Sequence, residues 1–340
     1  MPSDFLLSPS APLDLATLRQ LLTSNARVVL AADAYAPTPP APATTPVADE
    51  LRAYACGTGP ELPNDLVRLL LLLRVQTLAP TAATAPTVQR LLDFYNREIF
   101  PVVYQQGDDA VAAAHLCLPL LGEGEVSYQG YRLQAADVLH LFSWAPVALT
   151  AAEVTALLAG APLTLAYAVH GLLRLERLSR VAEELALPAV GDSPQSATRD
   201  ALAYLQQVVE ALCSPGATAA ALSLPLDLLR LTAVQLGEQS AGRTQAWLAT
   251  TDQPVFQPLH RTGAAIRRQN QQSPSADQLG NVLRNVEQLL GLELLVATQL
   301  RPEPTPLLTA FREQVLRPGP TPLPSTTLRA AGDFVRDYLQ

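Results

Sequence analysis

The sequence predicts a mostly α-helical protein, an elongated bundle of long helices with one small β-hairpin. Aromatic residues make up only 5% of the 340 residues, whereas hydrophobic residues make up 49%. The core must therefore be built from Leu, Ala and Val, a mixture that favours helices over strands. Long segments with broad apolar faces predict helices over 162–186, 198–212, 217–249 and 276–300.

Most polar landmarks of the chain gather in one segment, residues 99–141. Gly107-Asp108-Asp109 forms a tight corner before an apolar helix predicted over 110–121. One of the two carboxylates is expected to accept hydrogen bonds from the free N–H groups of the first helical turn. Gly122-Glu123-Gly124 ends the helix, because Gly readily adopts the left-handed conformation found there. Residues 126–128 and 131–133, joined by Gln129-Gly130, predict the hairpin.

The rest of the chain is read as helices joined by Pro-rich or polar segments. Residues 36–47 and 318–324 are expected to be extended, because Pro repeats every few positions. Residues 250–274 are expected to be polar and irregular. Asn64 or Asp65 is expected to begin a helix that runs to residue 78. The remaining expected elements are a short strand over 27–30 and helices over 11–23, 86–98, 135–142, 151–158, 302–316 and 328–339.

Charge and composition restrict the partners. The net charge is −8 and no basic stripe is visible, so nucleic acid is not expected as a partner. Residues 69–73, a run of five Leu, are too short to span a bilayer. A membrane is therefore not expected as a partner either. The three Cys are isolated, as expected of free thiols in the cytoplasm. Charged residues are only 16% of the chain, which favours a stable, tetramer-like oligomer.

The cations are unusual, because all 23 are Arg and the chain has no Lys. This excludes any mechanism that needs a Lys Schiff base or a Lys general base. The four His residues show no metal-ligand spacing, so no metal site is expected. The first interpretation of the missing Lys is codon bias.

Several motifs around the corner follow one another in the order of a known family. Gln106-Gly107, residues 109–115, Leu121-Gly122-Glu123-Gly124 and the hairpin resemble the histidine and phenylalanine ammonia-lyase family. The likeness continues over residues 51–340 through many weak matches in order and spacing. It implies a long-helix bundle of the ammonia-lyase and fumarase–aspartase type. It also suggests four segments, an N-terminal helix and loop over 1–50, a lyase-like part over 51–195, bundle helices over 196–300 and C-terminal helices over 301–340.

The same comparison shows what is missing. The family's Ala-Ser-Gly cyclises into a methylidene-imidazolone electrophile, but this tripeptide occurs nowhere in the chain, and Asp108 stands where the family has a six-residue stretch. Ala159 replaces the Asn that supports the electrophile. The family's substrate-binding Arg and mobile-loop Tyr have no counterparts. The resemblance therefore implies a degenerate member without ammonia-lyase activity and without a cofactor.

Candidate site residues each have a structural alternative. Asp108, Asp109, His115 and Tyr104 are the candidates for acid–base catalysis. Gln105 and Gln106 could line a remnant pocket, and Arg267 and Arg268 could bind an anion. The alternatives are a helix cap beside a solvated carboxylate, a hydrogen-bonded His at a cavity edge, loop packing, and a solvated turn.

Three functions are compatible with this pattern. The first is a catalytically inactive structural or regulatory partner, assembled with itself or with an active lyase relative. The second is a repurposed enzyme that performs acid–base elimination, dehydration or isomerisation without the electrophile. The third is a binder of small aromatic or carboxylate ligands. A sealed environment around His115 favours the first, and an open pocket where Asp and His converge favours the second.

Overall fold

The computed structural model describes residues 4–7, 13–24, 26–31, 47–78, 81, 83–186, 195–213, 218–249, 257–271, 279–300, 305–316 and 324–338. The loops predicted over 36–46 and 318–323 lie outside these ranges. The chain forms two compact units. Unit 1 comprises residues 1–170 and 209–222, and unit 2 comprises residues 171–208 and 223–340.

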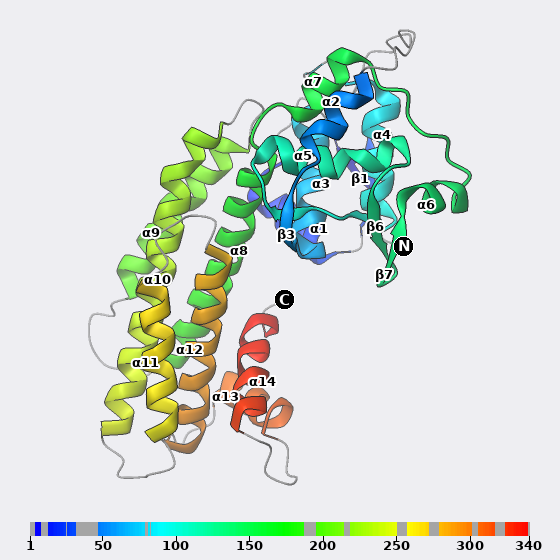
Figure 1. Cartoon of the computed structure of the whole chain (residues 1–340). Coiled ribbons are helices and arrows are strands. Elements are labelled where there is room, and N and C mark those ends of the chain that lie inside the picture. The colour runs from blue at the N-terminus through cyan, green and yellow to red at the C-terminus, as the bar shows by residue number, and fades with distance from the viewer. Residues whose placement is uncertain are drawn as a thin grey trace. The chain divides into compact units, whose positions relative to one another are not determined.

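Unit 1 is built around a fully buried helix, α3 (Asn64–Leu78), with the bounds that the sequence predicted. Its five consecutive Leu, residues 69–73, are all fully buried, so this helix meets neighbours on every side. In Figure 1 it lies inside a shell of shorter helices. These are α1 (Leu15–Thr23), α2 (Val47–Tyr54), α4 (Ala85–Asn96), α5 (Asp109–Cys117), α6 (Ala135–Leu141) and α7 (Ala151–Leu158).

Three small sheets accompany these helices, more than the single hairpin that the sequence predicted. The hairpin itself is confirmed as β6 (Glu125–Tyr128) and β7 (Tyr131–Gln134), and β4 (Phe100–Pro101) pairs with β6. In addition, β1 (Phe5–Leu7) pairs in parallel with β2 (Val28–Leu30), and β3 (Thr58–Glu61) pairs in antiparallel with β5 (Tyr104–Gln106). β3 reads Thr-Gly-Pro-Glu, which has no strand propensity, so only its partner reveals it.

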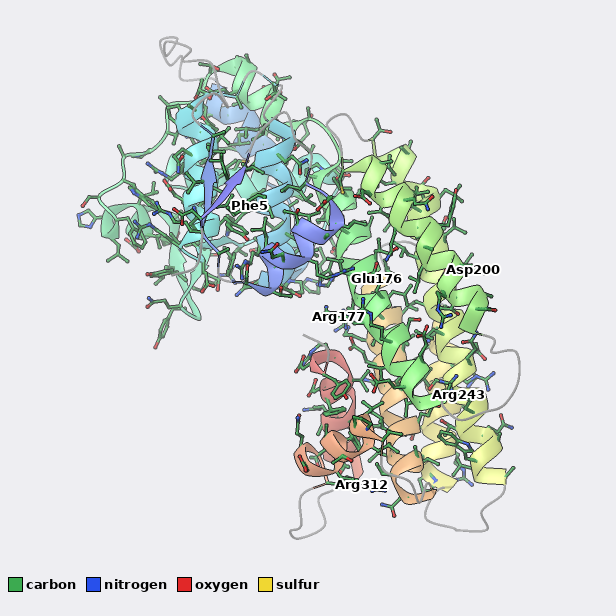
Figure 2. The ribbon with its side chains drawn as sticks, turned by 180° about the vertical axis from the view of Figure 1, so that it is seen from behind. Phe5, Glu176, Arg177, Asp200, Arg243 and Arg312 are labelled. Atoms are coloured by element: carbon green, nitrogen blue, oxygen red, sulfur yellow. The ribbon has the colours of Figure 1, made fainter. Side chains whose placement is uncertain are left out.

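Unit 2 consists of long helices that lie side by side (Figure 1). Polar pairs join them. Glu293 is fully buried on α12 and receives two hydrogen bonds, of 2.5 and 2.9 Å, from Arg243 of α10, which is labelled in Figure 2. Arg174 of α8 binds Glu287 of α12 in the same bidentate manner, at 2.7 and 2.8 Å. The helices are α8 (Pro162–Ala186, which begins in unit 1), α9 (Gln195–Leu212), α10 (Ala219–Ala249), α11 (Gln257–Gln271), α12 (Leu279–Leu300), α13 (Pro306–Gln314) and α14 (Pro324–Asp337).

Two sequence expectations are wrong. Residues 257–271, expected to be irregular, form α11, because Leu259 and Ile266 lie seven residues apart on one face and pack with Leu289 and Leu292 of α12. The helix expected over 110–121 ends at Cys117 and continues as a 3-10 turn, Leu118–Leu121, where Pro119 lacks the N–H that an α-helix would use.

Two helical stretches are long and apolar enough to cross a membrane by length and composition alone, Ala151–Ala186 and Ala219–Ala249. The apolar window of the first is 61% buried within the protein, and that of the second is 39% buried. Core helices of soluble proteins meet the same criterion, so this composition does not establish a membrane span.

Candidate functional site

The two carboxylates of the corner each begin a helix. Asp108 is the N-cap of α5, where its Oδ1 accepts a hydrogen bond from the Val111 N–H at 2.9 Å. Asp109 was expected to be solvated if Asp108 was the cap, but it is half-buried and caps a second helix. Its carboxylate accepts hydrogen bonds from the N–H groups of Leu163 (2.8 Å) and Thr164 (2.9 Å), and from the Thr164 hydroxyl (2.6 Å), at the start of α8. Both carboxylates therefore hold the backbone at the start of a helix.

His115 is also engaged by the backbone. Its Nε2 accepts a hydrogen bond from the Gly57 N–H at 3.0 Å, so the ring is neutral and its proton lies on Nδ1. Burial lowers the pKa of His115, which favours the same neutral form. Gly57 permits this approach, because a Cβ there would lie 3.0 Å from Nε2. The His115 ring meets Tyr104 edge-on, with ring centroids 5.1 Å apart.

Residues 104–106 form a strand rather than a pocket wall. The Gln105 amide donates to the Glu61 carbonyl at 3.0 Å, and the Thr58 hydroxyl donates to the Gln106 Oε1 at 3.1 Å, so both side chains hold β5 to β3. The Tyr104 hydroxyl accepts from Arg132 at 3.2 Å. Arg132 also pairs with Glu61 and Glu125, which ties β3, β5, β6 and β7 together.

Arg267 and Arg268 lie on α11 in unit 2, whereas the corner lies in unit 1. Arg267 binds Glu238 of α10, with a 2.8 Å hydrogen bond from its Nε, and Arg268 is exposed. Arg267 lines a small hollow together with Thr244 and Leu259. The hollow has a volume of about 30 Å³ and holds no more than a water molecule. The alternative expected for these two residues, a solvated turn, is wrong, because both lie within a helix.

Two buried polar residues of unit 1 have structural roles that the sequence did not reveal. Arg74 of α3 is 2% exposed and donates to the carbonyls of Ala156 (2.5 Å) and Ala159 (2.8 Å) at the end of α7. Burial lowers its pKa. Glu153 is 1% exposed and accepts from Thr84, Thr87 and Thr150, so it holds the beginnings of α4 and α7 together. The Thr150-x-x-Glu153 spacing was a readable signal for part of this arrangement, because it is a capping box.

The corner does not fit the electrophile of the resembling family. That group would need an Ala-Ser-Gly loop between Gly107 and α5, but Asp108 joins them directly as the cap of α5. The hollow on α11 and two open grooves, around Arg27 and around Ser127, are not lined by His115, Asp108, Asp109 or Tyr104. Within the described ranges, no group of three or more His, Cys, Asp or Glu could hold a metal ion.

Comparison with known proteins gives a family signal over slightly less than half of the chain. Residues 39–191 match the sequence model of the family described as aromatic amino acid lyase. The histidine ammonia-lyase of Legionella pneumophila (strain Lens) is 37% identical over 137 residues, which are 38% of this chain and 27% of that protein. The histidine ammonia-lyase of Geobacillus sp. (strain WCH70) is 37% identical over 143 residues, 40% of this chain and 28% of that protein. The chain thus spans about a quarter of the length of the curated relatives it matches.

Solved structures extend the likeness in fold to the whole chain. The tyrosine aminomutase from Streptomyces globisporus superposes with a TM-score of 0.84 at 15% identity, over 98% of this chain and 97% of that chain. The histidine ammonia-lyase from Trypanosoma cruzi gives a TM-score of 0.82 at 17% identity, over 99% and 94%. At these identities the comparison shows the fold, which confirms the predicted mostly helical bundle.

Proposed function

We propose that the chain is a catalytically inactive member of the aromatic amino acid lyase family, whose sequence model its residues 39–191 match, and that it acts as a structural or regulatory partner of a lyase-type enzyme. One observation supports this most directly. The candidate acid–base groups of the corner hold the backbone, since Asp108 and Asp109 cap helices and His115 binds the Gly57 N–H. Groups that hold the backbone in this way are typical of a structural role rather than of general acid–base catalysis.

The missing electrophile supports the same conclusion. Elimination of ammonia from an aromatic amino acid removes a weakly acidic proton and expels a poor leaving group. General acid–base help contributes roughly 10²–10⁴-fold, which cannot replace a covalent electrophile. The repurposed-enzyme alternative needs an open pocket in which Asp and His converge, whereas the three hollows described above are lined by other residues, and Asp108, Asp109 and His115 hold different backbone N–H groups.

The chemistry is tested by incubating the pure protein with L-histidine, L-phenylalanine and L-tyrosine and following the absorbance of each unsaturated acid. We expect no turnover, with an active histidine ammonia-lyase as the positive control. Turnover that His115→Ala abolishes and His140→Ala preserves would contradict the proposal. His140 is the matched control because it is exposed on α6.

The partner role rests on the surface of unit 2. Leu224 and Leu231 of α10 are 62% and 52% exposed, and they lie seven residues apart on the same helical face. Tyr204 of α9 is 55% exposed. Large apolar side chains on two neighbouring helices are typical of a protein interface. We propose that this face joins copies of the chain, or the chain and an active relative, into a tetramer-like oligomer in the cytoplasm.

Light scattering measures the molar mass of the assembled particle. The double variant Leu224→Glu, Leu231→Glu is expected to lower the molar mass of the particle. The control Gln20→Glu, Gln129→Glu adds the same charge at exposed positions of unit 1 and removes no apolar side chain, so it should leave the assembly intact. A wild-type monomer at micromolar concentration would contradict self-association. Native mass spectrometry with an active lyase then tests mixed assembly, and its absence together with a monomer would overturn the partner role.

A further inference from the structure

An open groove of about 520 Å³ lies on unit 1, away from the corner. Three arginines line it, Arg27, Arg68 and Arg97, together with the carboxylates Asp93 and Glu98. Its wall is fixed, because the Asn96 side chain accepts from the Val28 N–H (2.9 Å) and donates to the Val28 carbonyl (2.8 Å), which holds β2 against α4.

Two of the arginines, Arg68 and Arg97, are held in place without an ion pair, and Arg68 also donates to the carbonyls of Leu21 (3.4 Å) and Ser24 (3.2 Å). The Arg97 guanidinium lies over the rings of Phe142 (4.6 Å) and Trp144 (5.4 Å). Arg68 lies over the Tyr95 ring at 5.2 Å, and Arg27 is exposed. Among the described residues, none of the three forms an ion pair with a carboxylate. Arginines positioned by aromatic rings are ready to bind a carboxylate or phosphate, and few conformations are lost on binding.

Glu98 occupies a position that ordinarily belongs to glycine. It follows the end of α4 with a φ of 55°, in the left-handed region. The Ile99 N–H donates to the Phe94 carbonyl (2.9 Å) and the Glu98 N–H to the Tyr95 carbonyl (3.2 Å), the two bonds of a Schellman motif. Gly adopts this conformation without steric cost, whereas Glu does not. A carboxylate is thus kept at the groove at the expense of backbone strain, and such strain gathers at functional sites.

Because of the Schellman motif, the Arg97 side chain is not needed as a cap of α4. The last carbonyls of α4 are already satisfied by the N–H groups of residues 97–99, so Arg97 is not needed to complete the helix end. Its guanidinium is therefore available to a ligand.

We infer that this groove binds a small zwitterion, a molecule that carries both a carboxylate and an ammonium group, as a free amino acid does. The carboxylate meets Arg27 and Arg97, and the ammonium group meets Glu98. The mixture of charges distinguishes this ligand from a simple anion, which the two carboxylates of the groove would repel. The site lies outside the corner, so the proposed lack of catalysis does not affect it.

Isothermal titration calorimetry tests the site with three matched probes, L-phenylalanine, 3-phenylpropanoate, which lacks the ammonium group, and 2-phenylethylamine, which lacks the carboxylate. We expect L-phenylalanine to bind at least about tenfold more tightly than either analogue, because each lost charged contact leaves its partner unpaired. Inorganic phosphate serves as the simple-anion probe. Phosphate or 3-phenylpropanoate binding as tightly as L-phenylalanine would overturn the zwitterion assignment.

Variants place the binding in the groove. Arg27→Gln and Glu98→Gln should each weaken L-phenylalanine binding about tenfold, whereas His115→Ala should leave it unchanged. Arg27 is the informative position, because Arg97 and Glu98 also line the groove around Ser127. Binding lost only in His115→Ala would assign the ligand to the corner instead, and no binding at about 10 mM would refute the site.

A second variant separates binding from folding. Glu98→Gly should raise the melting temperature, since it relieves the left-handed strain, and should still lose binding. Ser143→Gly is the matched control, because Ser143 also has a positive φ, of 54°, but does not line the groove. It should raise the melting temperature and keep binding. If Glu98→Gly binds as well as wild type, the carboxylate has no role in the site.

Discussion

Replacing Glu153 with Gln is expected to destabilise unit 1 by about 2–4 kcal/mol at pH 7, because hydrogen bonds to a buried charged group contribute about 1.5–3 kcal/mol each and an unpaired buried donor costs about 1–3. One carboxylate oxygen accepts from Thr84 N, Thr84 Oγ1 and Thr87 Oγ1 at 3.1, 2.6 and 2.7 Å. The other accepts from Thr150 N and Thr150 Oγ1 at 2.9 and 3.0 Å. A Gln amide nitrogen must face one backbone N–H, whichever way it is turned.

The pH dependence of this effect has a definite sign. Burial by itself would raise the pKa of Glu153, but the hydrogen bonds from Thr84, Thr87 and Thr150 outweigh it and hold the pKa below the ordinary value of 4.5. The carboxylate therefore stabilises the folded state fully above about pH 4.5, and this contribution is lost as the pH falls through the folded-state pKa. The stability difference between wild type and Glu153→Gln should shrink in acid.

Urea unfolding of both proteins in a Trp247→Phe background measures the effect. Trp144 then reports on unit 1, where it stacks on Phe142 with ring centroids 4.8 Å apart. Glu50→Gln is the control, since Glu50 is exposed on α2. A change below about 0.5 kcal/mol, or one independent of pH, would refute the reasoning.

Three further predictions concern packing and thiol chemistry. Gly291→Ala should destabilise unit 2 by about 1–3 kcal/mol in urea unfolding, because its Cβ would lie 3.0 Å from the backbone of Ala331 and Gly332. Gly242→Ala should instead stabilise unit 2 by about 0.5–1 kcal/mol, because its Cβ meets nothing within 4 Å. Arg243→Leu should cost about 3–5 kcal/mol in the same assay, since it leaves the fully buried Glu293 without its partner, and a neutral result would show that Glu293 is protonated or solvated. Burial raises the pKa of the Cys117 and Cys213 thiols to about 12, so a thiol reagent at pH 8 should modify only the exposed Cys56 in the native protein, and rapid labelling of all three would contradict the burial.

Local signals in the sequence predicted part of this structure correctly. The bounds of α3 follow from Asn64 and Asp65 at its start and from its run of Leu. Asp108, the cap of α5, is one of the two residues that the sequence indicated for this position. Asp109 shows the limit, because its partners on α8 are 54 and 55 positions away and nothing near Asp109 identifies them. α11 was missed for a related reason, since its single apolar stripe becomes a helix only against α12.

The candidate site, too, could be predicted from the sequence only in part. The residues of the corner could be named from the sequence, but their uses depended on contacts from distant segments. His115 binds Gly57, 58 positions earlier. The groove of Arg27, Arg68 and Arg97 was not predicted at all, because three separate segments supply its charges.

The exclusive use of Arg in this chain bears on its behaviour in alkaline solution. A Lys–Glu pair loses its cation as the pH rises through about 10, whereas a guanidinium group keeps its charge above 12. The contacts of Arg174 with Glu287 and of Arg243 with Glu293 therefore remain intact where lysine pairs would fail. Two of the three thiols also stay protonated to about pH 12. The Arg–Glu pairs that join the helices of unit 2 are thus less sensitive to alkali than Lys–Glu pairs would be.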